Sequence, residues 1–291
     1  MDRKQFLATL AMLPIAGTAM KIDELHQITR SMESTGPMPV FFVGHGSPMN
    51  AIEQNEFTEG WRLMAGTIPK PKAILCISAH WETQGTFVTA MAKPRTIHDF
   101  GGFPQKLFDV QYPAPGSPDL ASKTQDALHK AQVLPDEKWG LDHGAWSVIM
   151  QMYPDASVPV VQMSLDYSKD PEDHYEMAKD LAALRNKGVL IMGSGNLVHN
   201  LRAIDWSRQK DGFDWAIEAD DKFKSLILAN DHQQLVNYRK LGVAVEKAVP
   251  TPEHYLPLLY VLALQESRDK VTFSNEKLVM GSISMRSVMI G

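Results

Sequence analysis

Short runs of apolar residues recur along the chain, and glycine or proline lies close to each of them. Four runs are rich in valine, isoleucine and other residues typical of buried strands. They are residues 39–43, 73–78, 158–163 and 189–192. Between these runs lie patterns with helical spacing, such as residues 119–131 and 173–185. Strands that alternate with helices predict an α/β fold, with a mostly parallel or mixed central sheet covered by helices on both faces.

A further apolar segment, residues 257–264, has the character of a buried helix. Thr251 and Pro252 precede it, and they suit a capping residue and a proline at the first helical position. We therefore expect this helix to begin near Pro252. No internal repeat, low-complexity tract or linker divides the chain, so we predict one domain over residues 36–291.

Residues 1–35 form a separate leader in this interpretation. A basic pair is followed by an uncharged, mostly apolar run that ends in small residues, which is the order of a secretory signal and resembles a relaxed twin-arginine signal. The run is shorter than the roughly 20 apolar residues of a spanning helix, and no later segment predicts a membrane span. The alternative is an N-terminal helix packed on the domain. Because the second arginine is missing, we expect a cytoplasmic protein; export to the periplasm through a signal between Met1 and Ala19 is the alternative.

Composition narrows the classes of function. The 291 residues are 44% hydrophobic and 22% charged, with a net charge of -5, which is ordinary for a globular protein. No cluster of lysine and arginine indicates a nucleic-acid partner. The single cysteine, Cys76, excludes an internal disulfide framework and a cysteine-rich zinc site. It lies within an apolar run, where we expect a small buried hydrophobic residue.

Three of the four predicted strands lead into a histidine. His45 follows residues 39–43, His80 follows the second run and His199 follows the fourth. Ligands of open α/β sheets bind beyond the carboxyl ends of the strands, so these side chains can converge although they are distant in the sequence. His254, at the start of the last predicted helix, can reach the same edge. The pattern predicts a shared metal site.

Other interpretations of single residues are weaker. A lone histidine is usually a surface or hydrogen-bonded structural residue, and four are set aside on that ground: His26, His129, His174 and His232. The sequence Gly44-x-Gly46 lacks the third glycine of a dinucleotide-binding loop. Ser47 does not lie in a Gly-x-Ser-x-Gly elbow, which argues against an acyl-enzyme hydrolase.

Two aromatic segments have the composition of pocket walls. Residues 96–104 contain His98, and residues 139–146 contain His143 and Trp146, together with glycines and other aromatic side chains. Aromatic faces with a few polar groups suit a flat ring substrate. Rigid turns packed by aromatic residues explain the same composition equally well.

Seven motifs occur in an order that matches a known family. They are Gly44-His45-Gly46-Ser47-Pro48, Ser78-Ala79-His80-Trp81, residues 96–104, residues 112–118, residues 140–146, Gly195-Asn196-x-x-His199-Asn200, and residues 251–258. Together they closely resemble the 4,5-DOPA dioxygenase branch of the class III extradiol ring-cleavage dioxygenases. The resemblance extends from about residue 39 to residues 281–285 and does not cover residues 1–35.

The resemblance implies an Fe(II) enzyme that inserts O2 next to the diol of a DOPA-like catechol and releases a ring-opened semialdehyde. Matched motif by motif, His45, His80 and His254 take the places of the metal ligands. His199 takes the place of the active-site histidine, which in some members also binds zinc, so the resemblance makes His199 a candidate metal ligand as well and leaves open whether it binds the ion. We expect His199 to be the acid–base group, because a neutral imidazole can accept a catechol proton at neutral pH.

The same matching places His143 where a side chain meets the substrate hydroxyls, so we assign it a catalytic and a substrate-binding role. His98 and Trp146, from the aromatic segments, complete the expected substrate contacts. The other partners expected are small molecules, a catechol and O2, with no nucleic acid and no membrane. The sequence leaves the oligomeric state and the particular catechol open.

The third ligand departs from the better-known class III pattern of two histidines and a carboxylate. Glu253 and His254 are adjacent here, and neighbours on a helix point about 100° apart, so we do not expect both on one ion. The DOPA-type motif favours His254. Because an all-imidazole set also suits zinc, Zn(II) stays an alternative to Fe(II) as the bound metal.

Two other functions fit the same ligands. A zinc-dependent hydrolase or amidase would use histidine ligands and an activated water. A non-catalytic metal-binding scaffold of the same fold is the second alternative, and the joint presence of His143 and His199 argues against it.

Overall fold

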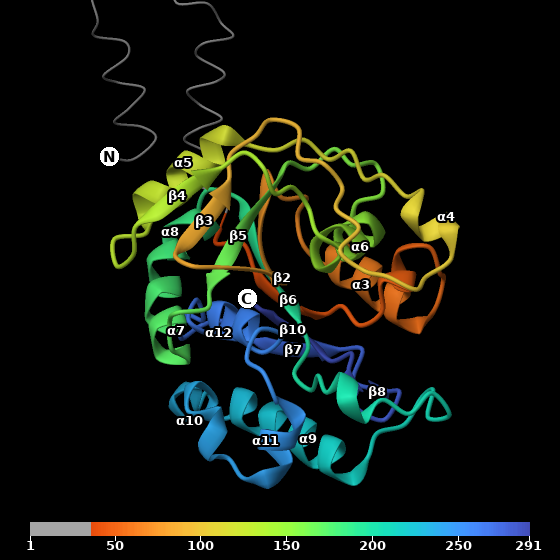
Figure 1. Ribbon diagram of the computed structural model, residues 1–291. Coiled ribbons are helices and arrows are strands. Elements are labelled where there is room, and N and C mark those ends of the chain that lie inside the picture. The colour runs from red at the N-terminus through yellow and green to blue at the C-terminus, as the bar shows by residue number, and fades with distance from the viewer. Residues whose placement is uncertain (1–35) are drawn as a thin grey trace, which may run out of the picture. The chain divides into compact units, whose positions relative to one another are not determined.

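Eight strands form one sheet in the order β4-β3-β5-β2-β6-β1-β10-β7 (Figure 1). The computed structural model describes residues 36–291, so the predicted leader over residues 1–35 and His26 lie outside the described residues. The strands are β1 (Val40–Gly44), β2 (Ala73–Thr83), β3 (Thr86–Thr89), β4 (Val133–Asp136), β5 (Val160–Asp166), β6 (Val189–Gly195), β7 (Val271–Ser274) and β10 (Ser287–Ile290). Two short strands, β8 (Leu278–Val279) and β9 (Ile283–Ser284), pair separately.

Helices connect the strands. The α-helices are α3 (Glu56–Gly66), α4 (Gln105–Phe108), α5 (Pro118–Ala127), α6 (His143–Met152), α7 (Pro171–Ala178), α8 (Ala182–Arg185), α9 (Asp214–Leu228), α10 (His232–Val236), α11 (Val243–Ala248) and α12 (Leu256–Leu262). The 3-10 helices are η1 (Pro48–Ala51), η2 (Lys179–Leu181), η3 (Leu201–Ala203) and η4 (Tyr238–Lys240). Within the described residues, no helix is long and apolar enough to cross a membrane.

The sheet is mixed, with a parallel centre. Strands β5, β2, β6 and β1 run parallel to one another, whereas β3 is antiparallel to β5, and β10 is antiparallel to β1 and β7. The four parallel strands are the four apolar runs that the sequence predicted. Strands covered on both faces need apolar residues at every position, which explains why these runs stand out. The predicted fold class is confirmed.

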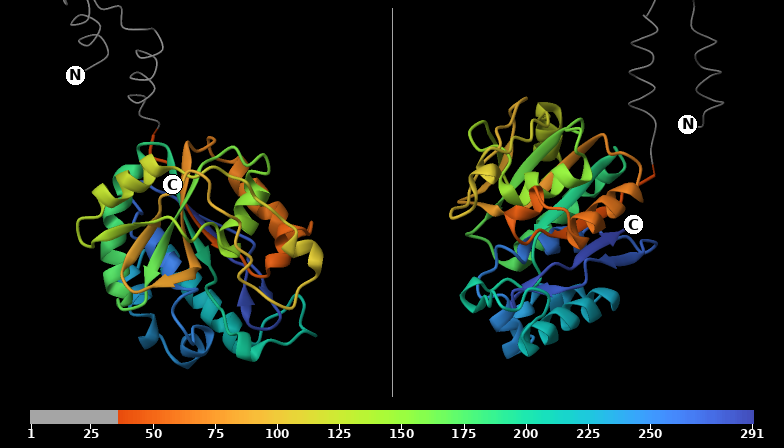
Figure 2. Two further views of the ribbon diagram at one scale, coloured as in Figure 1. Left: turned by 45° about the horizontal axis from the view of Figure 1, so that its top comes forward. Right: turned by 90° about the vertical axis from the view of Figure 1, so that its right-hand side faces the viewer.

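Alternate strand residues pack on opposite faces of the sheet. Phe42 joins one buried apolar cluster, which includes residues of α5, α7, α9 and α12, and Phe41 joins another, which includes residues of α3 and α6. Figure 1 shows α5, α7 and α8 on one side of the sheet and α3 and α6 on the other. The right-hand view of Figure 2 shows β7 and β10 between α3 and α9. Cys76 is buried in β2, as predicted.

Three predicted helices have different bounds. The helix predicted over residues 119–131 is α5, which ends at Ala127. Residues 173–185 are divided into α7, η2 and α8. The last apolar helix begins at Leu256 instead of near Pro252, with Pro257 in its first turn. The carbonyl oxygen of His254 accepts a hydrogen bond from the backbone N–H of Asn196 at 2.9 Å, so its partner lies in the segment after β6 and not in the helix. His254 therefore lies in a turn before the helix.

Candidate active site

The backbone of β1 and β2 positions the first two histidines. His45 follows β1, and its backbone N–H donates to the carbonyl oxygen of Gly195 at 3.1 Å. His80 lies within β2, which is longer than predicted, but beyond Ser78, where the ladder with β6 ends. The register of β2 against β5 shifts between Ile77 and Glu82. Such an irregularity turns a side chain out of the regular pleat, and here it brings His80 towards His45.

His254 reaches the same edge because the turn that carries it packs tightly against β6. A Cβ atom at Gly195 would lie 2.1 Å from the carbonyl oxygen of His254. Any side chain at residue 195 would therefore push the turn away from the strand. Glycine at this position permits the close approach of backbone to backbone.

The three side chains converge. One ring nitrogen from each of His45, His80 and His254 lies within 4.8 Å of the others. The Nε2 atoms of His45 and His80 are 3.1 Å apart. His45 and His254 are buried and His80 is half-buried. The arrangement brings together His45 and His80, which the strand-end pattern singled out, with His254, which we expected to reach the same edge from the start of the last helix.

Hydrogen bonds on the far side of each ring indicate the tautomers. The hydroxyl of Ser194 donates to the carbonyl oxygen of Gly144 at 2.6 Å, so its oxygen accepts from Nδ1 of His45 at 3.0 Å. Nδ1 of His254 donates to Oε1 of Glu253 at 3.0 Å. Both rings thus keep the lone pair on Nε2, turned towards the convergence point. Partners of this kind orient the histidine ligands of metal sites.

His80 has a carboxylate on its outer side as well, since its Nδ1 lies 3.5 Å from Oδ2 of Asp99. With Nδ1 protonated, its Nε2 also has a lone pair. Two such lone pairs at 3.1 Å, as in His45 and His80, repel each other unless a cation or proton lies between them. The donor set therefore fits a metal ion bound by imidazole.

Burial keeps these imidazoles neutral. It lowers the pKa of His45 and His254 well below the ordinary value of 6.5, and the neighbouring histidines lower it further. Burial also lowers the pKa of His80 to about 3 and that of His199 to about 4. Neutral imidazole is the form that binds a metal or accepts a proton.

His143, the first residue of α6, is held by the carboxylate of Asp99. Its Nδ1 donates to Oδ2 of Asp99 at 3.0 Å, and its backbone N–H donates to Oδ1 at 2.9 Å. Burial alone would raise the pKa of Asp99, but the hydrogen bonds and charge of His143 bring it below the ordinary value. Asp142 caps α6 and accepts a hydrogen bond from Ser78 of β2 at 2.7 Å, which fixes the helix to the strand.

His199 lies beside the three converging histidines. Its ring stacks on that of His254, with centroids 3.4 Å apart and planes 10° apart. Its ring nitrogen groups with His254 and Glu253, but not with His45 and His80. The geometry thus places His199 next to the convergence point, stacked on the ring of His254.

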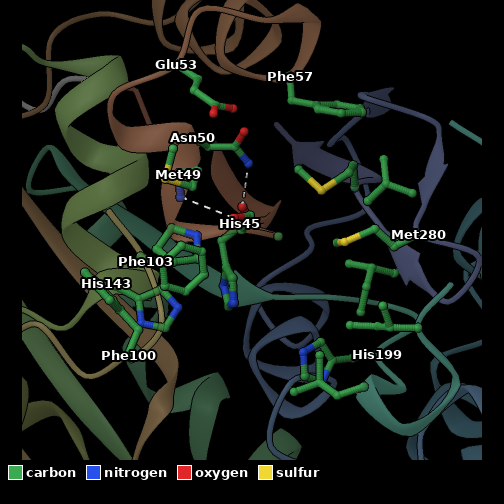
Figure 3. A pocket seen from close by; sticks show the side chains of 18 of the residues that line it. His45, Met49, Asn50, Glu53, Phe57, Phe100, Phe103, His143, His199 and Met280 are labelled. Atoms are coloured by element: carbon green, nitrogen blue, oxygen red, sulfur yellow. Dashed lines mark hydrogen bonds between the residues drawn. The ribbon is translucent and has the colours of Figure 1, made fainter. Parts of the chain in front are cut away.

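All five of these histidines line a cavity of about 580 Å³. Figure 3 labels His45, His143 and His199 among them. Phe100 and Phe103, from the first aromatic segment, form part of its wall. His98 and Trp146, expected to contact substrate, are not among the lining residues. Nε2 of His98 donates to the carbonyl oxygen of Val110 at 2.9 Å, and the fully buried indole of Trp146 donates to that of Ile97 at 2.8 Å. These two side chains support the wall from behind.

Several polar residues of the site were missed by sequence reasoning. Asp99 and Ser194 hold ring nitrogens of the histidines, and Glu253 orients His254 without being one of the three converging groups. Glu53 and the exposed Trp206 line the outer part of the cavity. Asp99 lies in the segment of residues 96–104 already noted, and Ser194 directly precedes the motif that begins at Gly195. Glu53 and Trp206 lie in segments with no periodic pattern.

The fold and the site together define a class: α/β proteins in which histidines converge at one edge of the sheet, as a set that fits a metal ion, and face a cavity with aromatic walls. Residues 36–290 match the family described as the catalytic LigB subunit of aromatic ring-opening dioxygenase. The chain belongs to this family of metal-dependent extradiol ring-cleaving dioxygenases, which confirms the resemblance found in its motifs.

Individual relatives agree with the family. The chain is 48% identical over 263 residues to a 4,5-DOPA dioxygenase extradiol of Escherichia coli K12, covering 89% of this chain and 96% of the relative. It is 40% identical over 226 residues to a protein of the same name from Beta vulgaris, covering 75% and 83%. The crystal structure of an uncharacterized protein from Escherichia coli K12 is similar with a TM-score of 0.75 and 44% identity, covering 87% of this chain and 100% of that one.

Proposed function

We propose that this protein is an Fe(II)-dependent dioxygenase that opens the ring of a catechol next to its diol. His45, His80 and His254 would hold the metal through Nε2. The observation that carries the proposal is the convergence of three neutral imidazoles, each with a polar partner at Nδ1, on a cavity that also contains His143 and His199. Bound there, iron(II) would bring catechol and O2 together and supply the redox chemistry.

The remaining residues bind the ring and move protons. His199, kept neutral by burial, accepts a proton from a catechol hydroxyl and returns it when the ring opens. His143 presents Nε2 to the second hydroxyl, because Asp99 occupies its Nδ1. Phe100 and Phe103 flank the ring and exclude water from this part of the cavity.

The test is anaerobic loading with Fe(II), followed by exposure to O2 and a panel of catechols. We expect one O2 consumed for each ring-opened semialdehyde formed, and no O2 uptake by the same protein loaded with Zn(II). The proposal is overturned if the iron-loaded protein consumes no O2 with any catechol. Hydrolysis of esters or amides by the zinc-loaded protein would instead indicate a hydrolase.

A further inference from the structure

The cavity has a second end, away from the histidines, formed by Asn50, Glu53, Asn55 and Phe57; we call it the outer end. The volume of about 580 Å³ falls among pockets of roughly 300–1,000 Å³ that enclose drug-sized ligands. A catechol ring held at the histidines therefore leaves room for a substituent. Figure 3 shows Glu53 beyond Asn50 as seen from His45, with its carboxylate turned towards the hollow.

The amide side chains around the outer end are engaged within the protein. Nδ2 of Asn50 donates to the carbonyl oxygen of His45 at 3.1 Å, and Nδ2 of Asn55 donates to Oδ1 of Asn50 at 2.9 Å. Nε2 of Gln209, which also lines the cavity, donates to the carbonyl oxygen of Trp206 at 2.5 Å. Each of these amide nitrogens thus has one of its two N–H groups engaged within the protein, and none of them carries a positive charge that would neutralise a substrate carboxylate.

Glu53 differs from these amides and from its neighbour Glu56. Within residues 36–291, the Glu53 side chain has no ion pair or hydrogen bond, whereas Glu56 pairs with Lys277 and with Lys210. Among the described residues that line the cavity, none is lysine or arginine. The outer end therefore offers one carboxylate acceptor with no cation to neutralise it.

We infer that Glu53 determines the class of substrate by binding the ammonium group of a catechol that carries an alkylamine. This inference rests on the proposed ring cleavage. A primary alkylamine, with a pKa of about 10.4, is charged at neutral pH and forms a charge-assisted hydrogen bond to a carboxylate. Met49 and Phe57, which line the same end, provide apolar contacts for the alkyl linker. A catechol whose substituent ends in a carboxylate is repelled by the negative charge of Glu53. A catechol that carries an amino-acid side chain binds Glu53 through its ammonium group.

The test compares three catechols with one iron-loaded protein: dopamine, 3-(3,4-dihydroxyphenyl)propionate and neutral 4-methylcatechol. We expect the wild type to prefer the amine to the propionate. Because Glu53 is exposed, Glu53→Gln should lower the ratio of kcat/KM for dopamine to that for 4-methylcatechol by about three- to tenfold, mainly through KM. Glu53→Lys should reverse the preference between amine and propionate. Glu56→Gln, which removes a nearby carboxylate outside the cavity lining, should keep the wild-type ratio.

Binding without turnover gives an independent measurement. Calorimetric titration of zinc-loaded protein with dopamine should show a weaker Kd for Glu53→Gln than for Glu56→Gln, and the difference should shrink with added salt. The inference is wrong if both variants change alike, or if the wild type prefers the propionate. Failure of the proposed function would look different, since the iron-loaded wild type would then not cleave 4-methylcatechol at all.

Discussion

Two groups of buried histidines can be compared in this protein. On the side of the sheet covered by α7 and α12, Nδ1 of His174 lies 2.8 Å from the hydroxyl of Tyr260. His232 uses both ring nitrogens, with the hydroxyl of Tyr175 at 2.9 Å and Oε1 of Gln265 at 3.1 Å. Among the histidines of the cavity, His45 and His254 are buried and His80 is half-buried, and each of these three turns one nitrogen towards an open space. Burial lowers the pKa of these three histidines as it does that of His174 and His232, so convergence on a cavity is what makes a site.

The largest expected effect comes from breaking the convergence itself. His45→Ala should lose bound metal and ring cleavage together, because a lost ligand removes the site. Metal content and O2 uptake should be measured on the same anaerobically loaded sample. His174→Asn, outside the cavity, is the matched control and should retain metal. Full metal content in His45→Ala would contradict the ligand assignment.

His199→Phe should separate metal binding from catalysis. We expect the metal to stay, while the rate of ring cleavage falls by roughly 10²–10⁴-fold, the usual cost of losing an acid–base group. Metal analysis and single-turnover O2 uptake measure the two effects separately. If the variant loses its metal as well, His199 is a fourth ligand and the base must be sought at His143.

Asp99→Asn should have a smaller effect, because it changes a partner of the cavity histidines and not a ligand. The amide can still meet the ring of His143 but no longer carries the charge that orients both His143 and His80. We expect a loss of roughly 10–100-fold in activity or metal affinity, typical of residues that orient ligands. Asp142→Asn changes another buried carboxylate near His143 and tests whether the loss of activity or metal affinity is specific to Asp99. Wild-type kinetics in Asp99→Asn would show that His143 needs no carboxylate.

The smallest expected effect concerns His174, one of the histidines outside the cavity. Burial lowers the pKa of His174 to about 4. The unfolded chain therefore binds a proton more readily, so the stability that this group contributes is complete above about pH 6.5 and decreases as the pH falls towards 4. The variant His174→Asn can still contact the hydroxyl of Tyr260. Between about pH 7.5 and pH 5, its free energy of unfolding should fall by about 2 kcal/mol less than that of the wild type. Urea unfolding at each pH gives the difference. Equal slopes would mean that His174 is not neutral when buried.

The sequence predicted the centre of the sheet better than its edges. Strands β1, β5 and β6 are buried at every position and read as continuous apolar runs. β4 and β7 are short and partly exposed, so their residues give no such signal. Helix α6 was missed because it is buried almost throughout and has no polar face to reveal a helical period.

In the candidate site, too, some residues could be predicted from the sequence and others could not. His45 and His80 could be predicted because strand ends meet at one edge of the sheet. His254 was expected there from its place before the last apolar helix and from the family motif. The partners of these histidines could not be predicted, because Ser194 and Asp99 become neighbours of these rings only through tertiary packing. Glu53 gave no signal, since an isolated carboxylate in an irregular segment resembles any surface residue. The predicted substrate contacts of His98 and Trp146 lie behind the wall because their polar atoms bind backbone carbonyls.

The pairing of β10 with β1 has a consequence for biosynthesis. The backbone N–H of Gly44, next to His45, donates to the hydroxyl of Ser287, 243 residues further along the chain. Contacts this distant form slowly, and a ribosome that adds roughly 5–20 residues per second releases the two partners at different times. Until residues 254 and 287 have emerged, β1 is paired on the β6 side only, and the imidazoles of His45 and His80 lack that of His254. The proposed three-histidine site is therefore complete only after translation of nearly all of this domain, so binding of a metal by all three imidazoles has to follow synthesis of residue 254.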